Sequence, residues 1–502
     1  MGQFPALTCG MERWRATTLE LREFPHRDLF IENHAMRILF AATIAVSLLS
    51  DCSRAYAQTD QPEPQSVGAQ SESALTPSDN WPRFRGANGN SAVQNDKRLP
   101  TEWSAEKNVQ WRAKLPGWGW GSPVVWGDRV FISSVHSDDD YENPKAGLYL
   151  GRGRAAPPDT VHHWMVYCLD LNSGDVLWKH EAKTGKPGVP RHPKSCYAAE
   201  TPVTDGKRLY VLFGDVGLFC YSFDGDPLWS KKFDAKKTLM GYGAAASPVV
   251  FDNQVYVVYD NQEESWIASF DGESGRENWK TPRDETSTWA TPLVWTHADR
   301  TEIVVPGRKE NRAYSPDGKL LWHFDGKMSV LTIPSPLVVD NRLYITSGYF
   351  QDNKRPVFCI KPGASGDISL QGDATANDSI AWSLKKMGPY NTSPIVYGGY
   401  YYTLLDRGMI TCHDAKTGEL VYNRKRFPRG ASFTSSPWAY NGKVFFLSED
   451  GRTFVMPVGD EFKVERVNEL DELCLATPAI VRGKLLLRTV SGVYCLTQTA
   501  TK

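Results

Sequence analysis

A short marker recurs along this chain at a nearly constant period: serine or threonine, then proline, then an apolar run. Most neighbouring markers are 41 to 46 residues apart. That period matches a four-stranded propeller blade, and proline is tolerated at the first residue of a strand because no ladder donor is lost there. The eight markers begin at Ser122, Thr201, Ser247, Thr291, Ser335, Ser393, Ser436 and Thr477.

A turn that leads into a tryptophan forms a second repeat, which we place between the third and fourth strands of a blade. Its aspartate can accept backbone N–H groups of the turn, and its glycine can adopt a positive φ. We expect the tryptophan to pack between neighbouring blades, which makes the unit structural. Full and shortened versions comprise Asp170, Gly174 and Trp178; Asp224 and Trp229; Asp271, Gly275 and Trp279; Asp317 and Trp322; and Asp414 and Gly418.

The last unit ends near Leu496 with only three strands, and residues 108–112 can supply the fourth. Such closure leaves no exposed sheet edge at the joint. The sequence therefore predicts an all-β fold, an eight-bladed β-propeller over residues 79–498; seven blades would require one marker to be spurious. Insertions at 137–163 and 183–195 should share one face and form a partial lid over the channel, and a third insertion at 362–379 should lie on the other face.

The region before residue 79 is predicted to be an export sequence and a linker. A signal peptide is predicted over 36–57, because this segment begins with a positive charge, continues with a short apolar run and ends in a small-x-small cleavage signal. The polar, Gln-, Ser- and Pro-rich residues 58–78 indicate a disordered linker. Residues 1–35 are either a mis-started extension or a genuine leader. Because Asp51 is a poor neighbour for a lipidated Cys52, a soluble exported protein of the periplasm or cell envelope is favoured over a lipoprotein.

Composition argues against several classes of function. The net charge of -1 gives no support for a nucleic-acid partner, and the mature chain has no run long enough for a transmembrane helix. Five of the seven cysteines after the signal peptide share one strand position of the repeat, which favours packing over disulfide bonding. Cys196 and Cys474 fall outside that position. No zinc-type Cys-x-x-Cys pattern occurs.

The residues just before each marker should face the channel, and they form our candidate binding ring. Its aromatic side chains suit a planar ligand, with packing at the neck of the channel as the alternative. Glu200, Asn391 and Glu472 are candidate cation ligands, but hydrogen bonding to loop backbone is the favoured interpretation. Arg429 is available for an anion. The aromatic members are Trp118, Trp120, Tyr197, Tyr242, Trp289, Tyr390 and Phe433.

The Asp-x-x-[Ser/Thr]-Gly-x-x-x-Trp units resemble the repeats of the pyrroloquinoline-quinone (PQQ)-like β-propeller family over about residues 81–497. Residues 81–86 and Gly89 also resemble the opening segment of exported bacterial members. The resemblance implies the fold, while the family contains both quinone-dependent dehydrogenases and non-enzymatic scaffolds. It further implies that an enzyme would hold PQQ with calcium, a carboxylate base and often a disulfide between adjacent cysteines. No adjacent cysteine pair occurs in this chain.

We therefore expect an exported, monomeric binding or scaffold module, with no residue assigned to catalysis or to a metal. Its partner is expected to be an envelope protein or a small planar or carbohydrate ligand. The alternative is a quinoprotein oxidoreductase that uses PQQ with calcium on an alcohol or a sugar. We interpret the charged residues of the lid insertions, including Arg191, His192 and Lys194, as a solvated surface, with an anion site as the alternative.

Overall fold

The computed structural model describes residues 79–139, 144, 146–147, 156–298, 300–428 and 432–499. The leader, signal peptide and linker expected over 1–35, 36–57 and 58–78 lie outside these residues, so those boundaries stay predictions. Within the described part, no helix combines the length and the apolar character that crossing a membrane requires.

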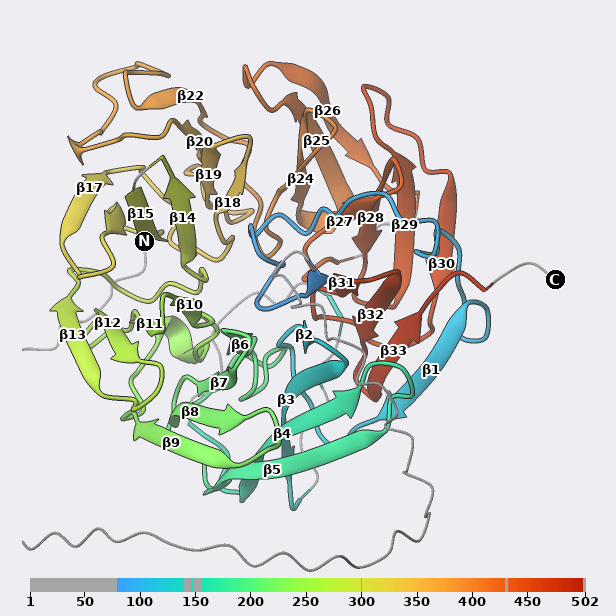
Figure 1. Ribbon diagram of the computed structural model, residues 1–502. Helices are drawn as coiled ribbons and strands as arrows, with labels where there is room; N and C mark the ends of the chain where they lie inside the picture. The colour runs from blue at the N-terminus through green and yellow to red at the C-terminus, as the bar shows by residue number, and fades with distance from the viewer. Residues whose placement is uncertain are drawn as a thin grey trace, which may run out of the picture. The chain divides into compact units, whose positions relative to one another are not determined.

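The described strands form eight sheets around a central channel (Figure 1). The predicted eight-bladed β-propeller is confirmed. In five of the sheets, four consecutive antiparallel strands lie side by side in sequence order, as expected for short connections between neighbouring strands. Two short 3-10 turns accompany the strands, Leu239–Gly241 (η2) and Asp406–Gly408 (η3).

The first four blades consist of β2 (Val124–Trp126), β3 (Arg129–Ser137), β4 (His162–Asp170) and β5 (Val176–Gly185); β6 (Val203–Thr204), β7 (Arg208–Phe213), β8 (Gly217–Ser222) and β9 (Pro227–Lys232); β10 (Val249–Phe251), β11 (Gln254–Tyr259), β12 (Trp266–Asp271) and β13 (Glu277–Pro282); and β14 (Leu293–His297), β15 (Arg300–Val305), β16 (Asn311–Tyr314) and β17 (Leu320–Phe324).

The last four blades consist of β18 (Leu337–Val339), β19 (Arg342–Thr346), β20 (Val357–Ile360) and β22 (Ile380–Leu384); β23 (Ile395–Tyr397), β24 (Tyr400–Leu405), β25 (Met409–Asp414) and β26 (Leu420–Arg426); β27 (Trp438–Tyr440), β28 (Lys443–Leu447), β29 (Arg452–Pro457) and β30 (Arg466–Glu469); and β31 (Ala479–Val481), β32 (Lys484–Arg488), β33 (Gly492–Leu496) and β1 (Val109–Lys114).

The circle closes through the N-terminal strand, as the sequence predicts. Strand β1 pairs antiparallel with β33, and the register joins Val109 to Leu496 and Lys114 to Gly492. The outer strand of the eighth blade therefore comes from the opposite end of the domain. This pairing removes the edge that β33 would otherwise expose.

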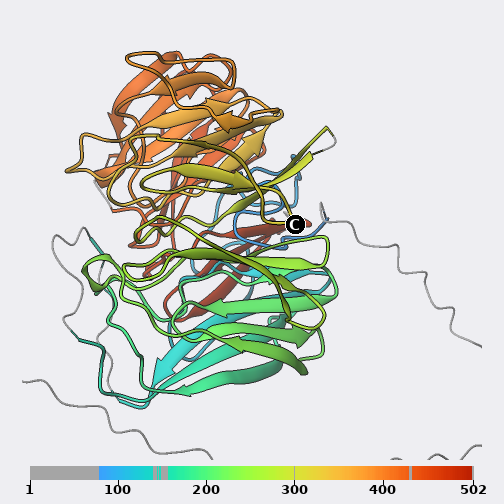
Figure 2. The ribbon, with the colours of Figure 1, turned by 90° about the vertical axis from the view of Figure 1, so that its left-hand side faces the viewer.

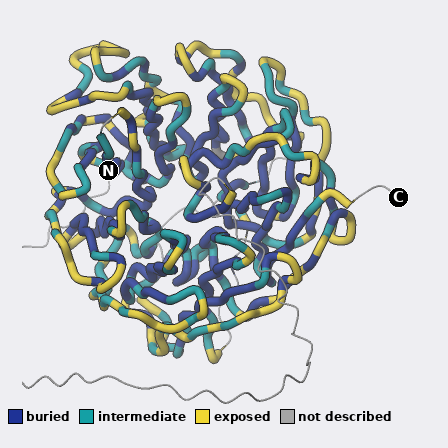
Figure 3. The backbone as a smooth tube through the Cα atoms, viewed as in Figure 1, coloured by how far each residue is buried: buried dark blue, intermediate teal, exposed yellow. Residues whose placement is uncertain are grey.

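Burial explains why the middle strands of a blade are apolar along their whole length. The middle strands β11 and β12 are almost wholly buried because neighbouring blades pack against both of their faces, whereas the outer strand β13 is mostly exposed. Figure 3 shows the same gradient around the circle, with buried backbone towards the channel and exposed turns at the rim. A run buried on both faces reads as continuously apolar rather than alternating.

The marker hydroxyls form a belt that links successive blades. The backbone N–H of one marker residue donates to the side-chain oxygen of the next, as in Thr201 N to Ser247 Oγ (2.9 Å) and Thr291 N to Ser335 Oγ (2.9 Å). Seven such bonds run from Ser122 to Thr477. Serine and threonine recur in the marker because each joint uses a side-chain acceptor for a buried N–H.

The repeated tryptophans lie between blades. The indole N–H of Trp178 donates to Phe223 O (2.8 Å), and that of Trp279 donates to Pro316 O (2.9 Å), in each case in the turn of the next blade. A Cβ added to Gly318 would lie 2.6 Å from the Trp279 ring, so glycine is required for the close approach. Trp111, Trp229 and Trp382 make the corresponding bonds.

Blade 4 departs from this pattern because the insertion at 362–379 returns to it. Strand β21 (Gly366–Asp367) pairs in parallel with β17, which gives this sheet a fifth strand. Ala364 and Ile368 join Trp322 in the apolar cluster shared by blades 4 and 5. The Trp322 indole donates to Glu302 Oε2 (2.6 Å) of its own blade instead of to the next turn.

Candidate ligand-binding cavity in the central channel

A cavity of about 230 Å³ lies in the channel and is lined by residues from every blade joint. Five members of the predicted ring reach it: Trp120, Tyr242, Trp289, Tyr390 and Asn391. They come together because each lies just before a marker, in the segment that leads into the innermost strand of a blade. The Trp289 indole is fixed by donating to Gly243 O (2.7 Å). The aromatic face of the cavity is thus held by backbone contacts of the blades themselves.

The segment after Asp79 closes one end of the channel. Phe84 lines the cavity from this side, and the buried Arg85 guanidinium donates to Ser335 O (3.5 Å) and Pro394 O. Burial lowers the pKa of Arg85 to about 9. Figure 2 shows this blue segment on one side of the blades. Residues 81–86, which carry the family resemblance, also cover this end of the cavity, and no local pattern in the sequence predicts that role.

The two lid insertions close the other end. Lys194 Nζ lies 2.6 Å from Glu449 Oε1 of blade 7 and also donates to Gly147 O (2.6 Å). Glu449 Oε2 accepts the Gly147 N–H (2.8 Å), and its Oε1 accepts the Thr434 hydroxyl (2.7 Å). The described parts of both insertions therefore meet over the channel at one carboxylate. Because the Lys194 and Glu449 side chains are only 11% and 1% exposed, the expectation of a solvated surface is wrong for Lys194.

Arg191 corrects the same expectation. It is buried, and its Nη1 donates to the carbonyls of His192 (3.1 Å), Pro193 (3.4 Å) and Ser195 (2.6 Å). It therefore shapes the lid backbone from within. His192 and Ser195 then line the cavity directly beneath this loop.

The hydroxyl belt also lines the cavity. Each of its seven side-chain hydroxyls accepts one backbone N–H. None of these hydroxyls donates a hydrogen bond to another described residue, and all seven line the cavity. A hydroxyl has one proton to donate and two lone pairs, so each retains a donor for a ligand. These side chains are Thr201, Ser247, Thr291, Ser335, Ser393, Ser436 and Thr477.

The remaining ring members do not line the cavity. The buried Tyr197 hydroxyl donates to Val189 O (2.9 Å) in the 183–195 insertion. Phe433 packs on Phe427 with ring centroids 5.7 Å apart. Trp118 pairs through its backbone with Val135, at the base of the lid hairpin. None of these three aromatic residues is among the residues that line the cavity. Arg429 lies outside the described residues.

The predicted cation ligands do not converge. Glu472 accepts a hydrogen bond from Tyr494 (2.8 Å) and pairs with Arg112 (2.5 Å). Glu200 lies in a separate space of about 10 Å³ beside Asp215, and its Oε1 accepts the Gly214 N–H (3.0 Å). Burial raises the pKa of Glu200 to about 8 and that of Asp215 to about 7.

Only Asn391 of the three reaches the cavity, and no carboxylate is among the described residues that line it. No group of three or more His, Cys, Asp or Glu side chains suited to a metal occurs in the described chain either. Calcium takes six to eight oxygen ligands, usually with carboxylates among them. The donor set therefore does not fit PQQ held with calcium. The seven described cysteines are all free, including Cys196 and Cys474.

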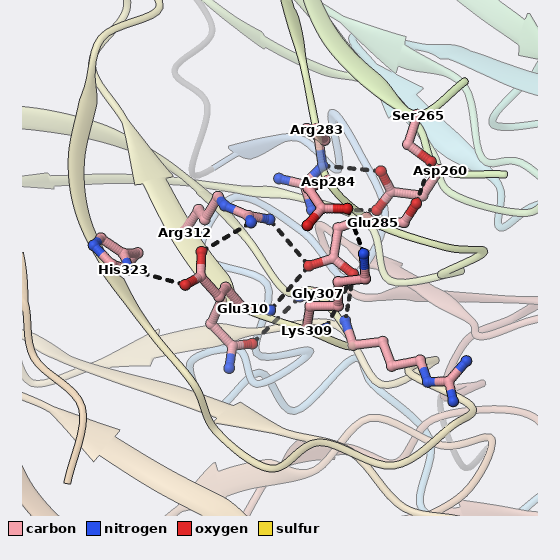
Figure 4. A network of polar contacts seen from close by, with 12 residues as sticks. Asp260, Ser265, Arg283, Asp284, Glu285, Gly307, Lys309, Glu310, Arg312 and His323 are labelled. Atoms are coloured by element: carbon pink, nitrogen blue, oxygen red, sulfur yellow. Dashed lines mark hydrogen bonds and ion pairs between the residues drawn. The ribbon is translucent and has the colours of Figure 1, made fainter. Parts of the chain in front are cut away.

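The densest charged cluster lies away from the cavity, at the loops that join blades 3 and 4 (Figure 4). Arg283 and Asp260 form a fully buried ion pair (2.9 Å), and Thr288 donates to the same carboxylate (2.7 Å). Glu285 accepts the backbone N–H groups of residues 308–310 and pairs with Arg312 (3.0 Å). The charges are satisfied within the protein, so we interpret this network as structural.

Comparisons with known proteins give a family and a fold. A family model described as outer membrane protein assembly factor BamB matches residues 163–322 and 263–461, together more than half of the chain. A europium-containing methanol dehydrogenase aligns with a TM-score of 0.53 and 14% identity, over 83% of this chain and 90% of that chain. A quinohemoprotein alcohol dehydrogenase of Pseudomonas putida HK5 aligns with a TM-score of 0.51 and 11% identity, over 85% and 81%.

BamB from Moraxella catarrhalis aligns with a TM-score of 0.49 and 13% identity, over 68% of this chain and 95% of that chain. No curated protein sequence matches at a significant level. At these identities, the two dehydrogenase structures with TM-scores above 0.5 show the fold alone. The family match is what classifies the sequence: the chain belongs to the PQQ-repeat β-propeller family whose model is described as outer membrane protein assembly factor BamB.

Proposed function

We propose that this protein is a non-catalytic binding module of the cell envelope and that the channel cavity is its ligand site. The lining of the cavity carries the proposal. Aromatic rings from several blade joints surround seven hydroxyl groups that retain a donor, and no carboxylate is present among the described lining residues. Concave sites of this kind, mostly apolar with a few convergent polar groups, are typical of ligand binding.

The lining also defines the ligand class. Aromatic faces pack against sugar rings or flat rings, and hydroxyl donors suit carbonyl, ether or hydroxyl oxygens. The ammonium of Lys194 is already paired with Glu449, so a charged ligand would enter without a free counter-ion. We therefore infer a neutral, oxygen-rich ligand, either a carbohydrate or a planar ring that bears carbonyl groups.

A quinoprotein oxidoreductase is the second candidate from the sequence. The aromatic lining suits the planar ring system of PQQ, but the cavity offers Asn391 alone of the expected calcium ligands. Lys194 is the one lysine or arginine among the described lining residues, and it is engaged by Glu449. The described lining therefore offers few groups that would hold an anionic quinone and its metal.

Intrinsic fluorescence of the purified protein tests the proposal, because Trp120 and Trp289 line the cavity. The probes are neutral oligosaccharides of glucose, mannose and N-acetylglucosamine, and PQQ with and without calcium. We expect saturable binding of at least one neutral glycan, weakened by Tyr242→Ala and unchanged by Tyr400→Ala, a half-buried tyrosine outside the cavity. Calcium-dependent PQQ binding with dye reduction by an alcohol or aldose would overturn the proposal, as would the absence of glycan binding at millimolar concentration.

A further inference from the structure

A second cavity, of about 260 Å³, lies between blades 5 and 6 and shares no lining residue with the channel cavity. Four basic residues line it: Arg355 between β19 and β20, Lys386 after β22, Arg407 in η3 and Arg424 in β26. They come from two blades and from segments far apart in sequence. We call this group the basic pocket.

Among the described side chains that line the basic pocket, Asp352 is the one acidic group beside four basic ones. That carboxylate accepts the Ser329 hydroxyl (2.9 Å), the Val330 N–H (3.0 Å) and the Lys354 N–H (2.8 Å). Although burial raises the pKa of Asp352, these hydrogen bonds lower it below its ordinary value. The carboxylate is therefore engaged by its own loop and by the segment before β18.

Three of the four cations have no acidic partner in the described structure: no ion pair joins Lys386, Arg407 or Arg424 to a described Asp or Glu. Like charges held close together repel each other and attract anions. Because Lys386, Arg407 and Arg424 are exposed, solvent screens much of their mutual repulsion, and an anion that binds among them is attracted by all three.

The basic pocket is also built by backbone contacts. Arg355 Nε donates to Gly388 O (2.9 Å), and Arg355 O accepts the N–H groups of Met387 and Gly388 (2.8 Å each). These bonds fix Arg355 against the segment that carries Lys386. On the other wall, the Arg407 guanidinium carbon lies 5.4 Å from the centre of the Phe350 ring, a cation–π distance.

Arg407 and Arg424 also have an unusual backbone conformation. Arg407 has φ 60° and Arg424 has φ 46°, both in the left-handed region that side chains other than glycine rarely adopt. The β25–β26 register shifts between Ile410 and Cys412, on the same hairpin. Bulges of this kind redirect side chains and occur beside functional sites. Two strained arginines that line one pocket point to a role that offsets the strain.

We propose that the basic pocket binds a phosphate- or sulfate-type oxyanion group. Guanidinium groups present paired N–H donors that match such oxygens, and several cations around one site favour a multiply charged group. Phe350 connects the pocket to the channel through Tyr349, whose ring lies 4.9 Å from Phe350 and 5.1 Å from the Tyr390 ring. The oxyanion site therefore lies beside the channel cavity. It binds an anionic group, whereas the ligand proposed for the channel cavity is neutral.

Isothermal titration of the purified protein tests this proposal with three probes: inorganic phosphate, inorganic sulfate and glycerol 3-phosphate. We expect saturable binding that weakens with rising salt. Arg407→Gln and Arg424→Gln should each reduce affinity about tenfold, because each removes a charge-assisted contact. Arg276→Gln, an exposed arginine in a turn between β12 and β13, is the matched control and should leave affinity unchanged.

Tighter binding of glycerol 3-phosphate than of phosphate would identify an ester group on a larger molecule, and equal affinities would identify the free anion; either supports the site. Arg407→Lys should retain part of the affinity, which separates charge from mere stability, and melting curves should show that every variant is folded. Absence of saturable binding of all three probes would overturn the proposal. Equal affinity in wild type and both glutamine variants would do so as well.

Discussion

Replacement of Lys194 by methionine tests whether one ion pair holds the lid over the channel. Methionine preserves much of the length and apolar stem of lysine but removes the ammonium, which lies 2.6 Å from Glu449 Oε1. The Glu449 side chain is 1% exposed, so water cannot replace the lost partner without movement. Removing one partner of a buried ion pair costs about 3 to 5 kcal/mol of unfolding free energy.

The contacts that survive place the expected cost at the lower end of that range. Thr434 and the Gly147 N–H still donate to the Glu449 carboxylate. We therefore expect Lys194→Met to cost about 3 kcal/mol if the lid stays closed. If the lid opens instead, the global loss is smaller and appears as faster amide exchange at Gly147, because local opening relieves the stranded charge.

Urea unfolding and hydrogen exchange separate these outcomes. The double variant Lys194→Met with Glu449→Gln should recover about 2 kcal/mol relative to the single lysine variant, since no charge is left buried. Lys385→Met is the matched control, because its pair with Asp373 has the same kind of contact (2.8 Å) but side chains 66% and 100% exposed. The idea of a lid held by this pair fails if Lys194→Met and Lys385→Met give equal stability and equal exchange at Gly147.

Three further outcomes follow from the joints between blades. Gly318→Ala should lower the free energy of unfolding by about 2 to 4 kcal/mol, because the new Cβ would lie 2.6 Å from the Trp279 ring. Gly442→Ala, also at positive φ but with open space around it, should lower it by only about 1 kcal/mol. Equal losses in urea unfolding would contradict the role of the Trp279 contact. Ser335→Ala should cost about 1 to 2 kcal/mol because the Thr291 N–H loses its acceptor, while Ser122→Ala should change stability by less than about 0.5 kcal/mol because its hydroxyl has no partner; thermal melts compare the two, and equal losses would contradict the belt. Stability should fall as pH rises from about 4.5 to about 8, because folding raises the pKa of Glu200 and Asp215 and their contribution is fully present only below the unfolded pKa values. The double variant Glu200→Gln with Asp215→Asn should flatten this part of the stability curve, measured by urea unfolding from pH 4 to 9. An unchanged slope would refute the assignment to these two carboxyl groups.

The repeats predict the fold of this chain well because they are local. The Ser/Thr-Pro period, the Asp-to-Trp turn and the missing fourth strand of the last unit are each encoded within a few consecutive residues, and they were sufficient to predict eight blades closed by a strand near residue 109. The strand β21 was not predicted, since two residues carry no periodicity and their pairing depends on where a long insertion returns.

The site was only half predictable, for a related reason. A position before a marker brings Trp120, Tyr242 and Tyr390 to the cavity, but Tyr197, also before a marker, instead donates to Val189 O of the lid insertion. In a loop, side-chain direction is set by local turns rather than by strand alternation. Lys194 escaped prediction because its partner lies 255 residues away, and no pattern in the sequence links the two.

The ion pair between Lys194 and Glu449 also affects the joint at which the circle of blades closes. The hydroxyl belt begins at Ser122 and ends at Thr477, and between those two the next bond is missing: the Ser122 hydroxyl has no partner. There Arg488 reaches across to Gly121 O (3.1 Å), and its burial lowers the pKa of its guanidinium to about 10. This joint, between blades 8 and 1, therefore relies on a desolvated charge and on the N-terminal strand. The pair formed by Lys194, which precedes blade 2, and Glu449, on blade 7, spans this joint. The contact that covers the ligand cavity therefore also links segments on the two sides of this joint, which is held in addition by the Trp111 bond to Leu171 O and the Arg482–Asp128 ion pair. The lid variants should therefore lower the stability of the closing strand β1 as well as expose the channel.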